Sequence, residues 1–143
     1  MRAPSSSRSP TTTTPDPVTP TVAEAINEVR ETFAGAVVTA RDDHEGGAYV
    51  RIESVDPGAP YVQRETWIGF RITGQYPYAD VYPLFVRPDL RRSDGRPLGE
   101  ALTTATFDGQ PAVQVSRRQN HLDPGADTAA LKVLKVLQWL ASR

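Results

Sequence analysis

Three residue types that form hydrolytic triads occur close together near the end of the chain, as Ser116, His121 and Asp123. In such a triad a histidine removes the serine proton while a carboxylate orients the imidazole. Residues this close in sequence rarely converge on one another, and the sharp turn that presents a nucleophilic serine is missing here. We therefore expect turn and helix-capping hydrogen bonds from them. We predict no catalytic residue, although the question of enzyme activity stays open.

A second chemically active group consists of Asp42, Asp43, His44 and Glu45. Adjacent residues in a tight turn seldom face one ion, so we expect no metal there. The chain has no cysteine, which excludes disulfides, thiolate metal sites and a thiol nucleophile. It also has no glycine-rich phosphate loop and no dinucleotide fingerprint, so we expect no cofactor.

The residues with a binding character fall in two segments. The first is a polar, cationic loop just before a predicted helix, where guanidinium and helix N–H groups would both favour an anion or a protein partner. A solvated loop is the alternative. The second is a proline-rich turn whose rigid aromatic side chains would make good interface anchors. The predicted partner-binding residues are Tyr76, Pro77, Tyr78, Tyr82, Arg117, Arg118, Asn120 and His121.

The proline pattern of the second segment, GQYPYADVYPLFVRPDL (74–90), is first of all structural. Pro77 moves Tyr76 out of the helical region of backbone space, which ends the preceding strand. Pro83 lacks an N–H group and fits only at the start of a strand or on a sheet edge. We expect a turn leading into an edge strand over 81–87.

Two amphipathic helices are predicted to hold these segments in place. The first spans 21–34, with Thr21 and Glu24 as a capping box. The second spans 127–142, with Asp127 as its N-cap. Helical spacing places the following residues on their core-facing sides: Val22, Ile26, Val29 and Phe33 in the first, and Ala130, Leu131, Val133, Leu134, Leu137 and Leu140 in the second.

Between the helices, alternating apolar and polar residues predict strands at 36–42, 47–56, 65–73 and 81–87. Their short connections imply an antiparallel meander. Residues 88–110 are turn-rich and are predicted to be irregular, followed by a short extended piece at 111–116. The predicted fold is α+β: an N-terminal helix, a four-stranded antiparallel meander, an irregular segment and a C-terminal helix packed on the sheet.

Composition limits the setting of this domain. Residues 1–20 are mostly Pro, Ser and Thr and are expected to form a disordered tail, which leaves one folded domain over 21–143. A net charge of −1 gives no general attraction to nucleic acid or to anionic membranes, and neither is expected as a partner. No secretory signal and no membrane-spanning apolar run is visible, so we expect a cytoplasmic protein.

The stretch GFRITGQYP (69–77), followed by Pro83 and Val86, resembles the ubiquitin-conjugating (UBC-like and RWD-like) superfamily. In that family a strand ends in a Tyr-Pro pair, and a further proline leads the last strand of the sheet. The segment 115–141 also resembles the loop and Leu-rich helix of its prokaryotic members. The resemblance covers about 21–141 and implies a UBC-like fold.

The sequence also departs from the pattern of this family. Family members transfer a ubiquitin-like protein through a cysteine thioester, and the expected region, 105–120, contains no cysteine. The His-Pro-Asn triplet is missing as well. We therefore expect a pseudoenzyme: a non-catalytic adaptor that binds a ubiquitin-like or activating-enzyme-like protein in a prokaryotic conjugation pathway. One alternative is an active enzyme whose natural sequence has a cysteine within 105–120. Another is an unrelated small α+β ligand-binding domain, which a sheet other than a four-stranded meander would favour.

Overall fold

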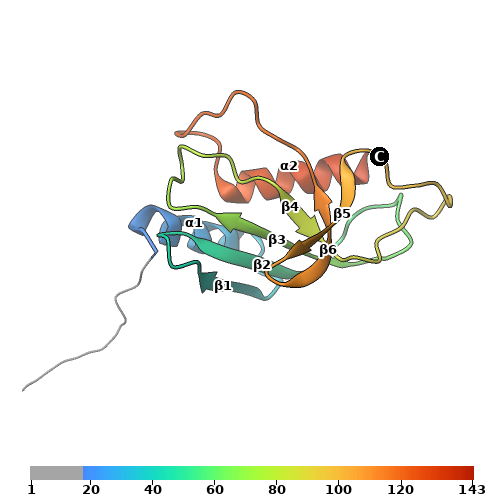
Figure 1. Ribbon diagram of the computed structural model, residues 1–143, viewed down its shortest axis with the longest axis horizontal. Helices are drawn as coiled ribbons and strands as arrows, with labels where there is room; N and C mark the ends of the chain where they lie inside the picture. The colour runs from blue at the N-terminus through green and yellow to red at the C-terminus, as the bar shows by residue number, and fades with distance from the viewer. Residues whose placement is uncertain (1–17) are drawn as a thin grey trace, which may run out of the picture.

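Two helices and six strands make up the part of the chain that the computed structural model describes, residues 18–143 (Figure 1). Of the predicted tail, residues 1–17 lie outside the described part of the chain. In chain order the elements are α1 (Pro20–Thr32), β1 (Val38–Asp42), β2 (Ala48–Val55), β3 (Thr66–Ile72), β4 (Leu84–Val86), β5 (Leu102–Phe107), β6 (Gln110–Val115) and α2 (Ala129–Ala141).

All six strands form one antiparallel sheet in the order β1-β2-β3-β4-β6-β5. The predicted four-stranded meander is therefore wrong, because the segment predicted to be irregular and the extended piece after it contain β5 and β6. These two strands form a hairpin around Asp108 and Gly109, whose φ angles of 50° and 80° suit a two-residue turn. An Asp-Gly pair between β-branched and apolar residues is itself a signal for a hairpin. The glycines and prolines that precede it led to the prediction of an irregular segment, but the hairpin forms nevertheless.

The proline-marked strand β4 lies inside the sheet and not at its edge, contrary to prediction. Ile68 of β3 pairs with Val86 on one side of β4, and Leu84 pairs with Val115 of β6 on the other. Pro83 directly precedes the first paired residue, so its missing N–H leaves no gap in the ladder.

Both predicted helices are present, but their first residues differ from the prediction. Helix α1 begins at Pro20, and Thr19 caps it by accepting the Val22 N–H at 3.1 Å. A proline is well tolerated in the first turn, where its N–H is not needed, so the helix starts before the predicted Thr21 box. Helix α2 is capped by Thr128 and not by Asp127.

The main core lies between the sheet and the two helices, which contact one another and cover the same face of the sheet. Val22, Ile26 and Val29 of α1 are buried there, as predicted. On α2 the buried face is rotated from the predicted one, so that Leu131 and Leu134 are partly exposed. The largest fully buried side chains of this core are Ile52, Ile68, Phe70, Ile72, Leu84 and Leu140.

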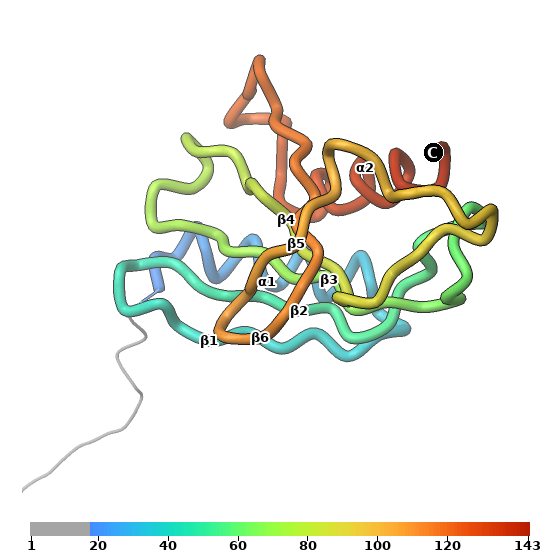
Figure 2. Tube along the Cα trace, turned by 45° about the vertical axis from the view of Figure 1, so that its right-hand side comes forward, coloured from blue at the N-terminus to red at the C-terminus, as the bar shows by residue number. Residues whose placement is uncertain are grey.

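A second, smaller cluster lies on the opposite face of the sheet, where the β5–β6 hairpin crosses it (Figure 2). Phe107 stacks on Phe85 with ring centroids 5.0 Å apart and also contacts Trp67 and Tyr49. It lies over Gly69, where an added Cβ would come within 2.5 Å of the ring. The hairpin thus closes over the outer face of β2, β3 and β4.

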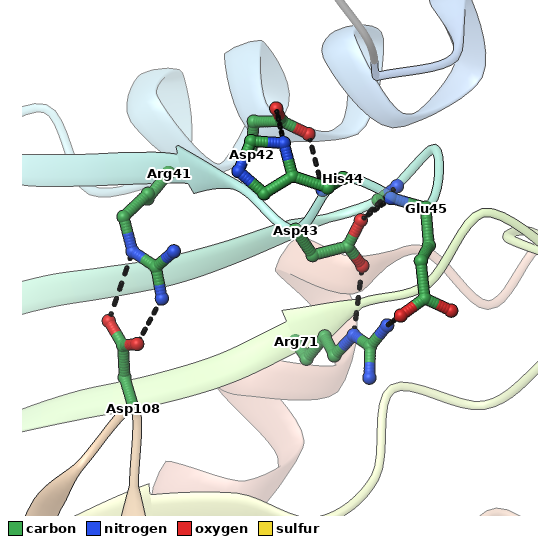
Figure 3. A network of polar contacts seen from close by, with 8 residues as sticks. Arg41, Asp42, Asp43, His44, Glu45, Arg71 and Asp108 are labelled. Carbon is green, nitrogen blue, oxygen red and sulfur yellow. Dashed lines mark hydrogen bonds and ion pairs between the residues drawn. The ribbon is translucent and has the colours of Figure 1, made fainter.

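The tip of this hairpin is also tied to the far edge of the sheet. Asp108 forms an ion pair with Arg41 of β1 (Figure 3). The sheet therefore curls until residues from its two ends meet. Of four large aromatic residues, Phe70 and Phe107 are buried, whereas Trp67 and Trp139 are partly exposed.

Candidate functional site

A single carboxylate joins the two segments that the sequence marks for binding. Asp80, in the 73–83 connection, holds Lys132 of α2 with both carboxylate oxygens, each 2.9 Å from Nζ. The same carboxylate accepts the backbone N–H of Gln119, in the 116–128 connection, at 2.7 Å. The Asp80 and Lys132 side chains are only 13% and 10% exposed. The ion pair therefore fixes both loops against one helix.

Tyr76 adds a second tie between the same parts. Its phenol oxygen accepts the N–H of Ala129, the first residue of α2, at 3.0 Å. Burial raises the pKa of Tyr76 above its ordinary value, against the opposing effect of the Ala129 hydrogen bond, so the phenol is neutral near pH 7. Tyr76 is half-buried and positions the start of the helix.

The two arginines of the cationic loop lie on aromatic rings. The guanidinium of Arg118 is 4.2 Å from the ring centroid of Tyr82, and Lys132 Nζ is 6.0 Å from the same ring. The guanidinium of Arg117 is 4.8 Å from the ring of Trp139, near the end of α2. Each contact is a cation–π interaction that holds the guanidinium over the ring.

The remaining predicted binding residues lie at the outer tips of the two loops. Tyr78 is 78% exposed, Asn120 and His121 are exposed, and Pro77 is partly buried. Within residues 18–143, neither the Asn120 nor the His121 side chain forms a hydrogen bond or an ion pair. The structure thus brings Tyr76, Tyr82, Arg117 and Arg118 together at α2 and leaves Tyr78, Asn120 and His121 free on the surface.

A cleft of about 200 Å³ lies between the cationic loop and α2. Two of its cations have carboxylate partners: Lys132, as described, and Lys135, whose Nζ is 3.6 Å from Asp127. For Arg117 and Arg118 no ion pair exists within the described part of the chain. The residues that line this cleft are Arg117, Arg118, Gln119, Lys132, Lys135, Val136 and Trp139. We call it the arginine cleft.

Sequence reasoning missed the helical side of this site. Lys132, Lys135 and Trp139 recur at intervals of three and four residues, so they share one face of α2. This spacing of two lysines and a tryptophan is a signal that could have been found. Asp80 offers no comparable signal, because its partner Lys132 is 52 residues away.

Ser116, His121 and Asp123 do not form a triad. Ser116 Oγ accepts a hydrogen bond from Gln114 Nε2 at 3.1 Å, and the Asp123 carboxylate accepts the N–H of Gly125 at 3.0 Å. Nowhere in the described residues does a hydrogen bond connect any two of the three. Ser116 and Asp123 therefore make local contacts in the strand end and the turn.

The acidic turn 42–45 is held by internal hydrogen bonds (Figure 3). The buried Asp43 carboxylate accepts the N–H groups of Glu45 and Gly47 at 2.7 and 2.9 Å, and Arg71 Nε donates to it at 2.9 Å. Among residues 18–143 no cluster of three or more acidic, histidine or cysteine side chains could hold a metal ion. Burial alone would raise the pKa of Asp43, but these hydrogen bonds outweigh it and lower the pKa below 3.8.

This lowered pKa predicts a pH-dependent contribution to stability. Because the folded pKa lies below the unfolded value of 3.8, the contribution is fully present above about pH 4 and is lost as the pH falls through the folded pKa. Asp43→Asn is expected to reduce the free energy of unfolding by about 1.5 to 3 kcal/mol at pH 7, since hydrogen bonds to a charged group are lost. Urea denaturation at a series of pH values should show this difference shrinking below pH 4. A constant difference down to pH 2 would contradict it.

Neither helix of the described chain has the length and the apolar character that crossing a lipid bilayer requires. The chain matches no protein-family model, and no curated protein or solved structure shows significant similarity to it.

Proposed function

We propose that this chain is a non-catalytic adaptor domain that binds a protein partner through the surface formed by residues 76–82 and 117–121. The observation that carries the proposal is the partly buried Asp80 carboxylate, which ties both segments to α2. A surface fixed in this way loses little conformational entropy on binding. It includes the largely exposed ring of Tyr78 and two arginines, Arg117 and Arg118, for which residues 18–143 supply no carboxylate partner, and tyrosine and arginine are enriched among interface hot spots.

The resemblance of residues 69–77 and 115–141 to ubiquitin-conjugating proteins supplies the proposed partner: a ubiquitin-like protein or an activating-enzyme-like protein of a prokaryotic conjugation pathway, in the cytoplasm. The lack of any cysteine in the sequence agrees with a binding role, because no thioester can form.

The six-stranded sheet gives weight to a second candidate, a small ligand-binding α+β domain unrelated to the conjugating enzymes. The arginine cleft is the specific feature in its favour, because its volume and its cations would suit a small anion. Titration with inorganic phosphate and small dicarboxylates separates this candidate from the adaptor.

Tyr78→Ala tests the adaptor proposal most directly. We expect at least a tenfold loss of affinity for a purified prokaryotic ubiquitin-like or activating-enzyme-like protein, measured by calorimetry, because the exposed ring is a rigid anchor. The melting temperature should stay unchanged, since the side chain is 78% exposed.

Val37→Ala is the matched control, because Val37 is also exposed but precedes β1, outside the proposed surface. Binding that tolerates Tyr78→Ala, or that is weakened equally by Val37→Ala, would refute the proposed surface. If no protein of either class binds, the proposed partner is wrong.

A further inference from the structure

We propose that the arginine cleft receives an acidic, extended segment of the protein partner, with carboxylates that pair with Arg117 and Arg118. This inference rests on the proposed function and names the chemistry of the partner at that site. Its starting point is the state of these two side chains: each guanidinium lies over an aromatic ring, and within residues 18–143 neither has a carboxylate partner. Five other arginines of that part of the chain are paired with a carboxylate, whereas Arg30, Arg64, Arg91, Arg96 and Arg143 also form no ion pair there; the paired ones are Arg41, Arg51, Arg71, Arg87 and Arg92.

The two arginines are already oriented for an ion pair. The guanidinium carbon of Arg118 lies over the Tyr82 ring and that of Arg117 over the Trp139 ring, at 4.2 and 4.8 Å from the ring centroids. Stacking uses the face of a guanidinium and leaves its N–H edge free to bind a carboxylate with two hydrogen bonds. Because the rings restrict the side chains beforehand, little rotamer entropy is lost when an anion binds.

The excess of positive charge in the cleft also favours binding of an anion. Four cations line it, and within residues 18–143 only the carboxylates of Asp80 and Asp127 pair with any of them. The whole chain carries a net charge of −1, so this positive region is local. Such a concentration of charge attracts acidic surfaces and accelerates their association.

The two arginines are held near different turns of α2, which favours an extended segment over a compact phosphate group. Lys132 lies near the Tyr82 ring that carries Arg118, whereas Arg117 lies on Trp139. Lys132 and Trp139 are separated by seven residues of α2, which is a rise of about 10 Å. An extended chain covers that distance in about three residues. Carboxylates two to four residues apart could therefore meet both arginines.

The N-terminus of α2 is not an open phosphate site either. The Ala129 N–H donates to Tyr76, and the Leu131 N–H donates to the Thr128 hydroxyl. Two donors that would otherwise bind a phosphate are therefore in use. The arginine side chains remain as the available donors, which suits carboxylates arriving along the cleft.

Capped hexaglutamate is a direct probe, with capped hexaglutamine as the uncharged control. We expect calorimetry to show binding of hexaglutamate that weakens at least threefold when salt is raised from about 50 to about 300 mM, because exposed charges are screened. Arg117→Ala with Arg118→Ala should weaken this binding at least tenfold, which corresponds to about 1.4 kcal/mol. The melting temperature of this variant should not fall, since repulsion between cations is relieved.

The charge-matched control is Arg64→Ala with Arg96→Ala, two exposed arginines outside the cleft. It should leave hexaglutamate binding unchanged, and Arg117→Lys with Arg118→Lys should restore only part of the affinity, because an ammonium lacks the planar fork. Comparing the capped peptide with one that has a free carboxyl terminus distinguishes an internal acidic stretch from a terminal carboxylate.

Equal losses in both double variants would mean general charge attraction and would overturn the inference. Tighter binding of inorganic phosphate than of hexaglutamate at the cleft would overturn it as well. If Tyr78→Ala abolishes partner binding while hexaglutamate does not bind, the inference fails and the proposed function stands. If hexaglutamate binds at Arg117 and Arg118 but no partner protein of the proposed classes does, the acidic-ligand site stands without that function.

Discussion

Asp80→Ala is expected to lower the free energy of unfolding by about 3 kcal/mol, because Lys132 would keep a buried charge without a partner. The Lys132 side chain is 10% exposed, and both of its bonds to Asp80 are 2.9 Å long. The backbone N–H of Gln119 would lose its acceptor at the same time. The expected loss is at the lower end for a broken buried ion pair, since both side chains keep some contact with water. Urea denaturation at pH 7 measures it.

The double variant Asp80→Ala with Lys132→Met separates the loss of a contact from the cost of an unpaired charge. Removing both charges should recover at least half of the lost stability, because methionine can fill the same space without needing a counter-ion. If the double variant is as unstable as the two single variants together, the ion pair is not the reason for the loss. The single variant should also weaken partner binding, because the 117–121 segment would lose its attachment to the 76–82 turn.

The parts of the fold that depend on local sequence patterns could be predicted. The pairing of strands that lie far apart in the sequence could not. The helices and the first three strands follow from apolar periodicity and short turns. Strand β4 was expected at an edge because Pro83 lacks an N–H group, but β6 pairs with β4 after the chain has first formed β5. No sequence pattern near residues 84–86 indicates that β6 pairs with this strand. The Asp108–Gly109 turn was an overlooked local signal for the β5–β6 hairpin.

The candidate site divides in the same way. Its tyrosines and arginines stand out by type, whereas the contacts that arrange them join residues far apart in sequence. In the sequence, Asp80 looks like an ordinary turn residue. Its contact with Lys132 forms only in the folded chain. The aromatic ring beneath Arg117 comes from the last turns of α2, so no spacing rule could indicate that the arginine is held in place.

Phe107→Ala is expected to cost about 3 kcal/mol of stability, because it removes a buried aromatic ring from the outer face of the sheet. The ring is 6% exposed and contacts Phe85, Trp67 and Tyr49. It packs the tip of the β5–β6 hairpin on the outer face of the sheet, so hydrogen exchange should increase most in β5 and β6. Thr104→Ala, an exposed position on β5, is the control and should change stability by less than about 0.5 kcal/mol.

Gly69 offers a sharper test of the same contact. In the natural chain Gly69→Ala should destabilise, because its Cβ would lie 2.5 Å from the Phe107 ring, which is itself stacked on Phe85. In the Phe107→Ala background the same change should be neutral or stabilising, because the obstructing ring is gone and alanine suits a strand better than glycine does. The sign of the Gly69→Ala effect should therefore reverse between the two backgrounds. Equal destabilisation in both would mean that the hairpin does not rest on Gly69. A reversal would show that the missing side chain at Gly69 is what lets the Phe107 ring, and with it the hairpin, close over the sheet.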